Sequence, residues 1–174
     1  MNIQVAIKML NQLLEAGIIS EYAIGGAVGA TFYLEPVATV DLDVFIDLRP
    51  SPGGLLLDTQ PLFAFLRQSG CELDGEYVLI GGWPVQFLAP PSRLVEDALL
   101  SARSVEVEGD RVRVFGPEHL AAIALETGRG KDKARLLEFV ESGALDLAEF
   151  ERIVEAFGLA GAWNEFKEQF LENE

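Results

Sequence analysis

Two acidic residues, Asp41 and Asp43, are separated by a single residue in the segment VATVDLDVFIDL, which is otherwise mostly apolar or β-branched. This composition predicts a strand over residues 37–48. Residues i and i+2 of a strand point to the same face, about 6.6 Å apart along the chain. Both carboxylates can therefore reach one cation or two adjacent ones, and Mg²⁺ commonly takes one or two protein carboxylates plus substrate phosphates. The alternative is a pair of exposed acids on an edge strand.

Gly25 and Gly26 precede this acid pair and directly follow IISEYAI, residues 18–24, which predict a strand. Without Cβ atoms, their backbone can approach a phosphate closely, and the start of a following helix offers N–H groups to an anion. Backbone amides and a metal on the acid pair would together hold a triphosphate, which suits nucleotidyl transfer. A tight turn without a ligand is the other interpretation of the two glycines.

Four of the 13 basic residues fall within seven positions, as Arg129, Lys131, Lys133 and Arg135. Lys131 and Arg135 are four residues apart and share one face of the helix expected there, whereas Lys133 points elsewhere. These two cations could neutralise a triphosphate. The alternative is a solvated helix face, the usual fate of a charge run.

The composition narrows the classes of function. The net charge of the 174-residue chain is −15, which disfavours broad binding of DNA or RNA, although it allows a local basic pocket. No stretch approaches the roughly 18 consecutive apolar residues that a membrane helix needs, so no membrane partner is expected. The chain start does not resemble a secretory signal, and Cys71 has no second cysteine to pair with. A cytoplasmic protein is expected.

The elements that must position these residues follow from hydrophobic periodicity and turn signals. Further helices are expected at 3–16, after Gly26, near 56–69 and at 92–100, further strands at 76–80 and 84–88, and a hairpin at 105–115. Residues 117–172 carry helical patterns and no strand signal. We therefore expect an α/β (α+β) core over residues 1–116 with a helical C-terminal part, residues 117–174, packed on it. His119, the single histidine, is expected at the surface or as a helix cap.

The pattern GG, a spacer of 14 residues, then DLD and an apolar run resembles the nucleotidyltransferase superfamily. Within that superfamily the chain looks most like small bacterial members related to abortive-infection toxins. The segment EHLAAIALETGRGKDKARLLEF is similar to their helical segment with a GR-x-KD core, and the resemblance spans roughly residues 20–160.

This resemblance implies a mixed sheet flanked by helices and a Mg²⁺-dependent enzyme that transfers NMP from an NTP to an acceptor hydroxyl. The acceptor could be a small molecule, a protein or tRNA. The residues carried over are Asp41 and Asp43 as catalytic metal ligands, Gly25 and Gly26 in the phosphate loop, Thr39 where the family often has Thr, and Lys131 with Arg135 at the triphosphate.

One position departs from the family pattern. Active members usually supply a third carboxylate from a neighbouring strand, and here Gln86 stands in its place. Since Gln cannot act as a general base, the rival hypothesis is a catalytically degenerate domain that binds a nucleotide or a partner protein in a toxin–antitoxin or regulatory pair. The discriminator is whether another carboxylate, such as Glu76 or Glu126, reaches the face of the acid pair. A third hypothesis treats the pattern as accidental, in an unrelated α/β binding module.

Overall fold

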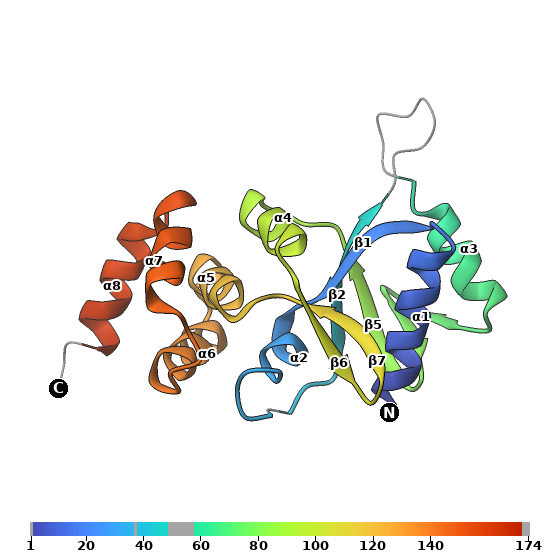
Figure 1. Cartoon of the computed structure of the whole chain (residues 1–174), viewed down its shortest axis with the longest axis horizontal. Helices are drawn as coiled ribbons and strands as arrows, with labels where there is room; N and C mark the ends of the chain where they lie inside the picture. The colour runs from blue at the N-terminus through green and yellow to red at the C-terminus, as the bar shows by residue number, and fades with distance from the viewer. Residues whose placement is uncertain (1, 37, 49–57, 172–174) are drawn as a thin grey trace.

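The computed structural model describes residues 2–36, 38–48 and 58–171. Within these ranges the strands form one seven-stranded mixed sheet in the order β3-β4-β5-β2-β1-β7-β6 (Figure 1). The strands are β1 Ile19–Ile24, β2 Leu42–Leu48, β3 Glu72–Asp74, β4 Tyr77–Ile80, β5 Trp83–Leu88, β6 Arg103–Val107 and β7 Asp110–Val114.

The central strand β2 runs antiparallel to β1 and parallel to β5. Its register with β5 places Asp43 opposite Gln86. The two edges of the sheet are hairpins, β3–β4 on one side and β6–β7 on the other. The sheet therefore brings the acid pair and the expected third position onto neighbouring strands.

One face of the sheet is covered by α1 (Ile3–Glu15) and α3 (Gln60–Gln68). Helix α1 begins after Asn2, whose side chain accepts a hydrogen bond from the N–H of Gln4 at 3.0 Å. Its buried residues recur at helical spacing and pack against alternate residues of β1, β2 and β7. Because side chains alternate along a strand, the buried Leu42 and Val44 leave Asp43 on the opposite face.

The opposite face carries α2 (Gly26–Ala30), α4 (Arg93–Leu100) and α5 (Pro117–Thr127). Helix α4 begins at the cap Ser92, and α5 ends at Gly128, which adopts the left-handed conformation of a helix C-terminus. Three further helices, α6 (Gly130–Glu141), α7 (Leu147–Ala156) and α8 (Ala160–Phe170), continue from α5 on this side (Figure 1).

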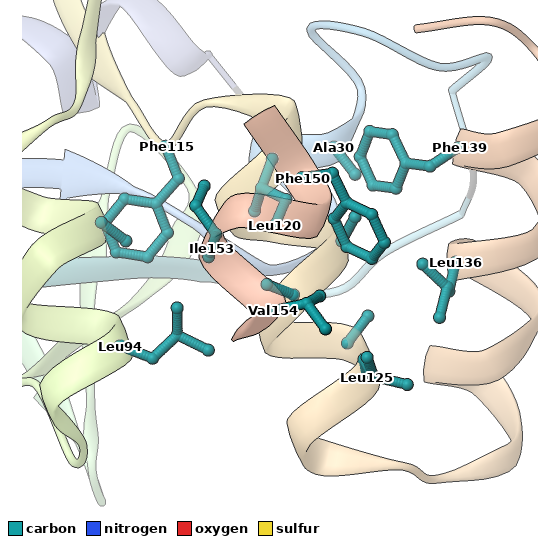
Figure 2. Packing of buried hydrophobic residues seen from close by; sticks show 14 of the residues in the cluster. Ala30, Leu94, Phe115, Leu120, Leu125, Leu136, Phe139, Phe150, Ile153 and Val154 are labelled. Carbon is teal, nitrogen blue, oxygen red and sulfur yellow. The ribbon is translucent and has the colours of Figure 1, made fainter. Parts of the chain in front are cut away.

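A single buried hydrophobic cluster joins this face of the sheet to the helices that follow it. Phe115, directly after β7, and Leu94 of α4 belong to the same cluster as Phe139, Phe150 and Ile153 of the C-terminal helices (Figure 2). The helices after residue 116 and this face of the sheet therefore share buried side chains.

Most predicted elements are present, with differences at three places. The strand expected over 37–48 begins only at Leu42. In the segment before it, the Thr39 hydroxyl donates to the carbonyl oxygen of Asp41 at 3.3 Å, a local contact of the kind that competes with strand pairing. The helix expected near 56–69 begins at Gln60, and residues 56 and 57 lie outside the described ranges. Strand β3 was not predicted, since its three residues are all exposed and show no apolar alternation.

The expectation for His119 is wrong. Its side chain is buried, and its Nε2 atom lies 2.8 Å from a carboxylate oxygen of Asp97 on α4. Over the ranges that the structure describes, no helix combines the length and the apolar character required to cross a membrane.

Candidate functional site

A cavity of about 850 Å³ lies between the strands β2 and β5 and the helices α5 and α6. This volume is within the range of small-molecule sites, roughly 300–1,000 Å³. Its wall on the side of the sheet includes Gly26, Thr39, Asp41, Asp43, Phe45 and Gln86. Its wall on the side of α5, α6 and the loop between them includes Leu120, Ile123, Glu126, Arg129, Lys131 and Arg135.

The acid pair lies on the sheet side of this cavity. Asp41 immediately precedes β2 and Asp43 is its second residue. Burial, followed by the negative charge of Asp41, raises the pKa of Asp43, whereas the charges of Lys131, Arg135 and Arg129 lower it. The carboxylate of Asp43 therefore lies in the electrostatic field of three cations, one in the loop before α6 and two on α6 itself. Charges of opposite sign face one another across the cavity.

Gly26 lies against the carboxylate of Asp43. Its φ of +58° is in the left-handed region, and a Cβ atom there would lie only 2.1 Å from Oδ2 of Asp43. The backbone conformation therefore favours glycine, and a side chain here would also displace the Asp43 carboxylate. The residue lines the cavity, so its bare backbone leaves open the space beside Asp43.

Gly25 has a different constraint. A Cβ atom at this buried position would lie 2.7 Å from the ring of Phe45 and 3.0 Å from that of Phe115, two rings that stack with centroids 5.0 Å apart. Its N–H donates to the carbonyl oxygen of Asp43 at 3.0 Å. Gly25 is not among the described residues that line the cavity, and its role toward a phosphate remains a prediction.

Thr39 lies beside the acid pair, in the segment before β2. Its hydroxyl is 3.3 Å from the carbonyl oxygen and 3.4 Å from Oδ1 of Asp41, and it lines the cavity. Because both residues precede β2, Thr39 does not share a strand face with Asp41. Its hydroxyl is instead placed to orient the Asp41 side chain.

Helix α6 presents its cations selectively. Lys131 and Arg135 line the cavity, one helical turn apart, whereas Lys133 is not among the described lining residues. Neither Lys131 nor Arg135 forms an ion pair with any residue that the structure describes. Their charges are available to an anion that enters the cavity.

Two lining residues of the same GRGKD segment were not predicted as site residues. Arg129 Nε lies 2.6 Å from a carboxylate oxygen of Asp132, whose side chain is almost fully buried. This pair ties the loop before α6 to the first turn of the helix. The short spacing of Arg129 and Asp132, three residues apart in a predicted helix start, was the available signal.

Gln86 occupies the third position of the site. It lies opposite Asp43 in the parallel pairing of β2 and β5, and it lines the cavity. Its amide Nε2 donates to Oε2 of Glu76 at 2.8 Å. Glu126 also lines the cavity, but its carboxylate accepts from the hydroxyl of Ser92 at 3.1 Å.

The donor set fits a cation that keeps water and substrate oxygens in its coordination sphere. Among the described residues, no group of three or more His, Cys, Asp or Glu side chains is arranged to hold a metal ion. Asp41 and Asp43 offer two carboxylates facing one cavity. Mg²⁺ is commonly held in this way, through one or two carboxylates plus phosphate oxygens, and not by an all-protein cage.

No protein-family model matches the chain, and a search of curated proteins gives no match. Solved structures do resemble it. An antigenic nucleotidyltransferase-like protein from Paracoccidioides brasiliensis superposes with a TM-score of 0.57 at 15% identity, over 91% of this chain and 90% of that chain.

Two structures of ANT(2'')-Ia are also similar. The crystal structure in complex with adenylyl-2''-tobramycin gives a TM-score of 0.52 at 16% identity, over 90% of this chain and 97% of that chain. The solution structure of this antibiotic-resistance factor gives 0.51 at 16% identity, over 95% and 97%. These likenesses confirm the fold predicted from the sequence, a nucleotidyltransferase-type mixed sheet flanked by helices.

Proposed function

We propose that this chain, which has the fold of the nucleotidyltransferase superfamily, is a Mg²⁺-dependent nucleotidyltransferase that transfers NMP from an NTP to an acceptor hydroxyl. One observation carries the proposal. Asp41 and Asp43 face the unpaired cations Lys131 and Arg135 across a single cavity of about 850 Å³. A triphosphate with a divalent cation would match both sides of that cavity.

Each charged group has a distinct task in this reaction. Asp41 and Asp43 would hold Mg²⁺, which when bound would neutralise charge on the phosphates. Lys131 and Arg135 would bind the oxygens of the β- and γ-phosphates. The acceptor oxygen forms a bond to the α-phosphorus while the bond from that phosphorus to the bridging oxygen breaks, and pyrophosphate leaves with the electron pair. Cations fixed beside the leaving group stabilise the charge that it gains.

The apolar part of the cavity wall could accommodate the nucleoside. Phe45 and Phe115 stack on each other, and both line the cavity with Leu120 and Ile123. A flat base buried against such side chains would gain both hydrophobic and ring-stacking stabilisation. Binding energy for the NTP would then come from both ends of the molecule.

The acceptor is proposed to be a small molecule that carries a hydroxyl. The ANT(2'')-Ia structure contains an adenylylated tobramycin, and its fold resembles that of this chain. A net charge of −15 disfavours a long phosphate backbone as acceptor more than it disfavours a small molecule or a protein.

A second candidate function is nucleotide binding without turnover, in a regulatory or toxin–antitoxin pair. The observation that favours it is the amide of Gln86, which lies opposite Asp43 where a carboxylate would serve as a base. Such a protein would bind the same Mg²⁺–NTP complex and release no pyrophosphate. The two candidates therefore differ in the chemical step and agree in the binding step.

The binding step is tested by isothermal titration calorimetry of ATP, GTP, CTP and UTP, each with Mg²⁺. The wild type is compared with the double variant Asp41→Ala/Asp43→Ala and with Asp47→Ala, a matched control whose acid lies on the same strand but outside the cavity lining. We expect wild type and control to bind at least one NTP and the double variant to lose at least tenfold in affinity, about 1.4 kcal/mol. Absence of binding to folded wild type would reject both candidate functions.

A further inference from the structure

The strand next to the acid pair carries no carboxylate opposite Asp43, but the residue at that position is hydrogen-bonded to one. Gln86 is opposite Asp43 in the register of β5 with β2, and its amide donates to Oε2 of Glu76 at 2.8 Å. Glu76 stands in the turn between β3 and β4. The β3–β4 hairpin therefore brings a carboxylate within hydrogen-bond distance of Gln86, which lines the cavity, while Glu76 itself is not among the described lining residues.

The environment of Glu76 leaves one of its carboxylate oxygens without a hydrogen-bond donor among the described residues. Its side chain is exposed, and only its Oε2 atom receives a hydrogen bond from the described residues. Oε1 is therefore open to a hydroxyl group of a bound molecule. The amide of Gln86 is uncharged, so it fixes the carboxylate by a hydrogen bond alone. An Arg or Lys partner would in addition neutralise the negative charge.

An adjacent phenol indicates that Glu76 and the acid pair share one region. Desolvation raises the pKa of Tyr77, and the negative charges of Glu76, Asp41 and Asp43 raise it further. These three carboxylates nevertheless do not form a group able to hold one metal ion. Glu76 is thus close to the acid pair but outside its coordination set.

The other acidic candidate is held in a different place. The carboxylate of Glu126 accepts from the hydroxyl of Ser92, the cap of α4. Glu126 also lines a second, smaller cavity of about 270 Å³ together with Arg93 and Phe157. Glu126 lines the main cavity as well, but no hydrogen bond joins it to Gln86. Glu76 is the carboxylate that the residue opposite Asp43 holds directly.

We propose that Glu76 is the general base of the nucleotidyl transfer and that Gln86 is the residue that positions it. This inference rests on the proposed function. Oε1 of Glu76 takes the proton of the acceptor hydroxyl as its oxygen bonds to the α-phosphorus, and the bond to the leaving pyrophosphate breaks. In this arrangement Gln86 on β5 orients the base, and the β3–β4 hairpin supplies it.

The test compares Glu76→Gln with Glu72→Gln, a control on the same hairpin whose side chain is also exposed. Binding of each Mg²⁺–NTP is measured by calorimetry, and pyrophosphate release is measured with water and with glycerol as hydroxyl donors. We expect Glu76→Gln to bind NTP within about twofold of wild type and to release pyrophosphate about 10²–10⁴-fold more slowly. Glu72→Gln should match wild type in both.

Two further variants separate a base from a structural residue. Gln86→Ala should lower kcat about tenfold with unchanged NTP affinity, because the carboxylate loses its orientation. Glu76→Gln/Gln86→Asp should recover part of the rate, since it returns a carboxylate to the strand beside Asp43. A merely structural Glu76 would not be rescued in this way.

The outcomes distinguish this inference from the proposed function. If folded wild type binds no NTP, the proposed function fails, and Glu76 has no role as a base. If wild type binds NTP and Glu76→Gln releases pyrophosphate at the wild-type rate, only the assignment of Glu76 is overturned. If wild type binds NTP but releases no pyrophosphate with either donor, the assignment is again overturned, and the binding-only candidate is favoured.

Discussion

At the residue scale, Asp43 serves the site at a cost to the fold. Its carboxylate is partly buried beside Asp41, and burial and this second negative charge both raise its pKa. The nearby cations offset only part of that effect. The divalent cation proposed above would, when bound, compensate for the stability that this carboxylate removes.

Asp43→Asn should therefore be more stable than wild type at neutral pH. The unfolded carboxyl titrates near its ordinary value of 3.8 and the folded one higher, so wild-type stability falls as the pH rises through this interval. The variant has no such loss. We expect its Tm at pH 7 to lie above that of wild type. Differential scanning fluorimetry checks this.

The difference in Tm between Asp43→Asn and wild type should shrink as the pH is lowered toward 3.8, because the Asp43 carboxyl then becomes protonated and, like Asn, uncharged. Asp47→Asn is the control, because Asp47 is exposed on the same strand, and its Tm should follow that of wild type at each pH. A lower Tm for Asp43→Asn at pH 7 in the absence of divalent cations would contradict the expected sign.

Gly26 is the position where backbone and side chain requirements meet. Gly26→Ala places a Cβ atom 2.1 Å from Asp43 Oδ2 at a φ of +58°. We expect urea denaturation to show a loss of about 2 kcal/mol or more. The same substitution at Gly161 of α8, where nothing lies within 4 Å, should stabilise by about 0.5–1 kcal/mol. A stabilising effect of Gly26→Ala equal to that of Gly161→Ala would contradict both the conformational and the steric argument.

At the scale of elements, α6 offers a comparison within one helix. Lys131→Ala and Arg135→Ala should each weaken Mg²⁺–NTP binding about tenfold or more, because each removes a cation that faces the cavity. Lys133→Ala removes the same charge from outside the lining and should change the affinity less than twofold at 0.15 M salt. Calorimetry at that ionic strength measures all three. Equal losses would indicate a general electrostatic effect of net charge.

Elements with strong periodicity or clear caps could be predicted from the sequence. The spacing of apolar residues predicts α1, and the helix expected at 92–100 matches α4, for which Ser92 is the cap in the structure. Strand β3 has no buried residue, so its pairing with β4 left no pattern in the sequence. The start of β2 was placed too early, since the apolar character of Val40 suggested a strand although this residue is exposed.

The candidate site could be predicted only as far as local spacing reaches. The acid pair, Gly26, Lys131 and Arg135 were identified from distances along the chain, and they line one cavity. The contact between Glu76 and Gln86 depends on how the β3–β4 hairpin pairs with β5, and Gly25 is constrained by rings of β2 and β7. Such long-range packing is not encoded in any short segment.

At the scale of the whole molecule, the cavity belongs to both parts of the chain. The acids come from residues before 117 and the cations from residues after it, so the site requires the two parts to keep one arrangement. Buried Glu118 of α5 contributes to this, because its carboxylate accepts from Arg103 of β6 at 2.7 Å and from the N–H of Asp146 at 3.1 Å. One cluster of buried apolar residues also runs through both parts.

These connections predict that the α/β core and the helical part unfold together. The chain holds two tryptophans, Trp83 in β5 and Trp163 in α8, one in each part. Trp163→Phe leaves a reporter of the sheet and Trp83→Phe leaves a reporter of the helices. In urea, the fluorescence midpoint of each variant should coincide with its own circular dichroism midpoint, the behaviour of one cooperative unit. If the Trp163 signal changed at lower urea than the circular dichroism, the C-terminal helices would be a separate unit, and the site could open without unfolding the sheet.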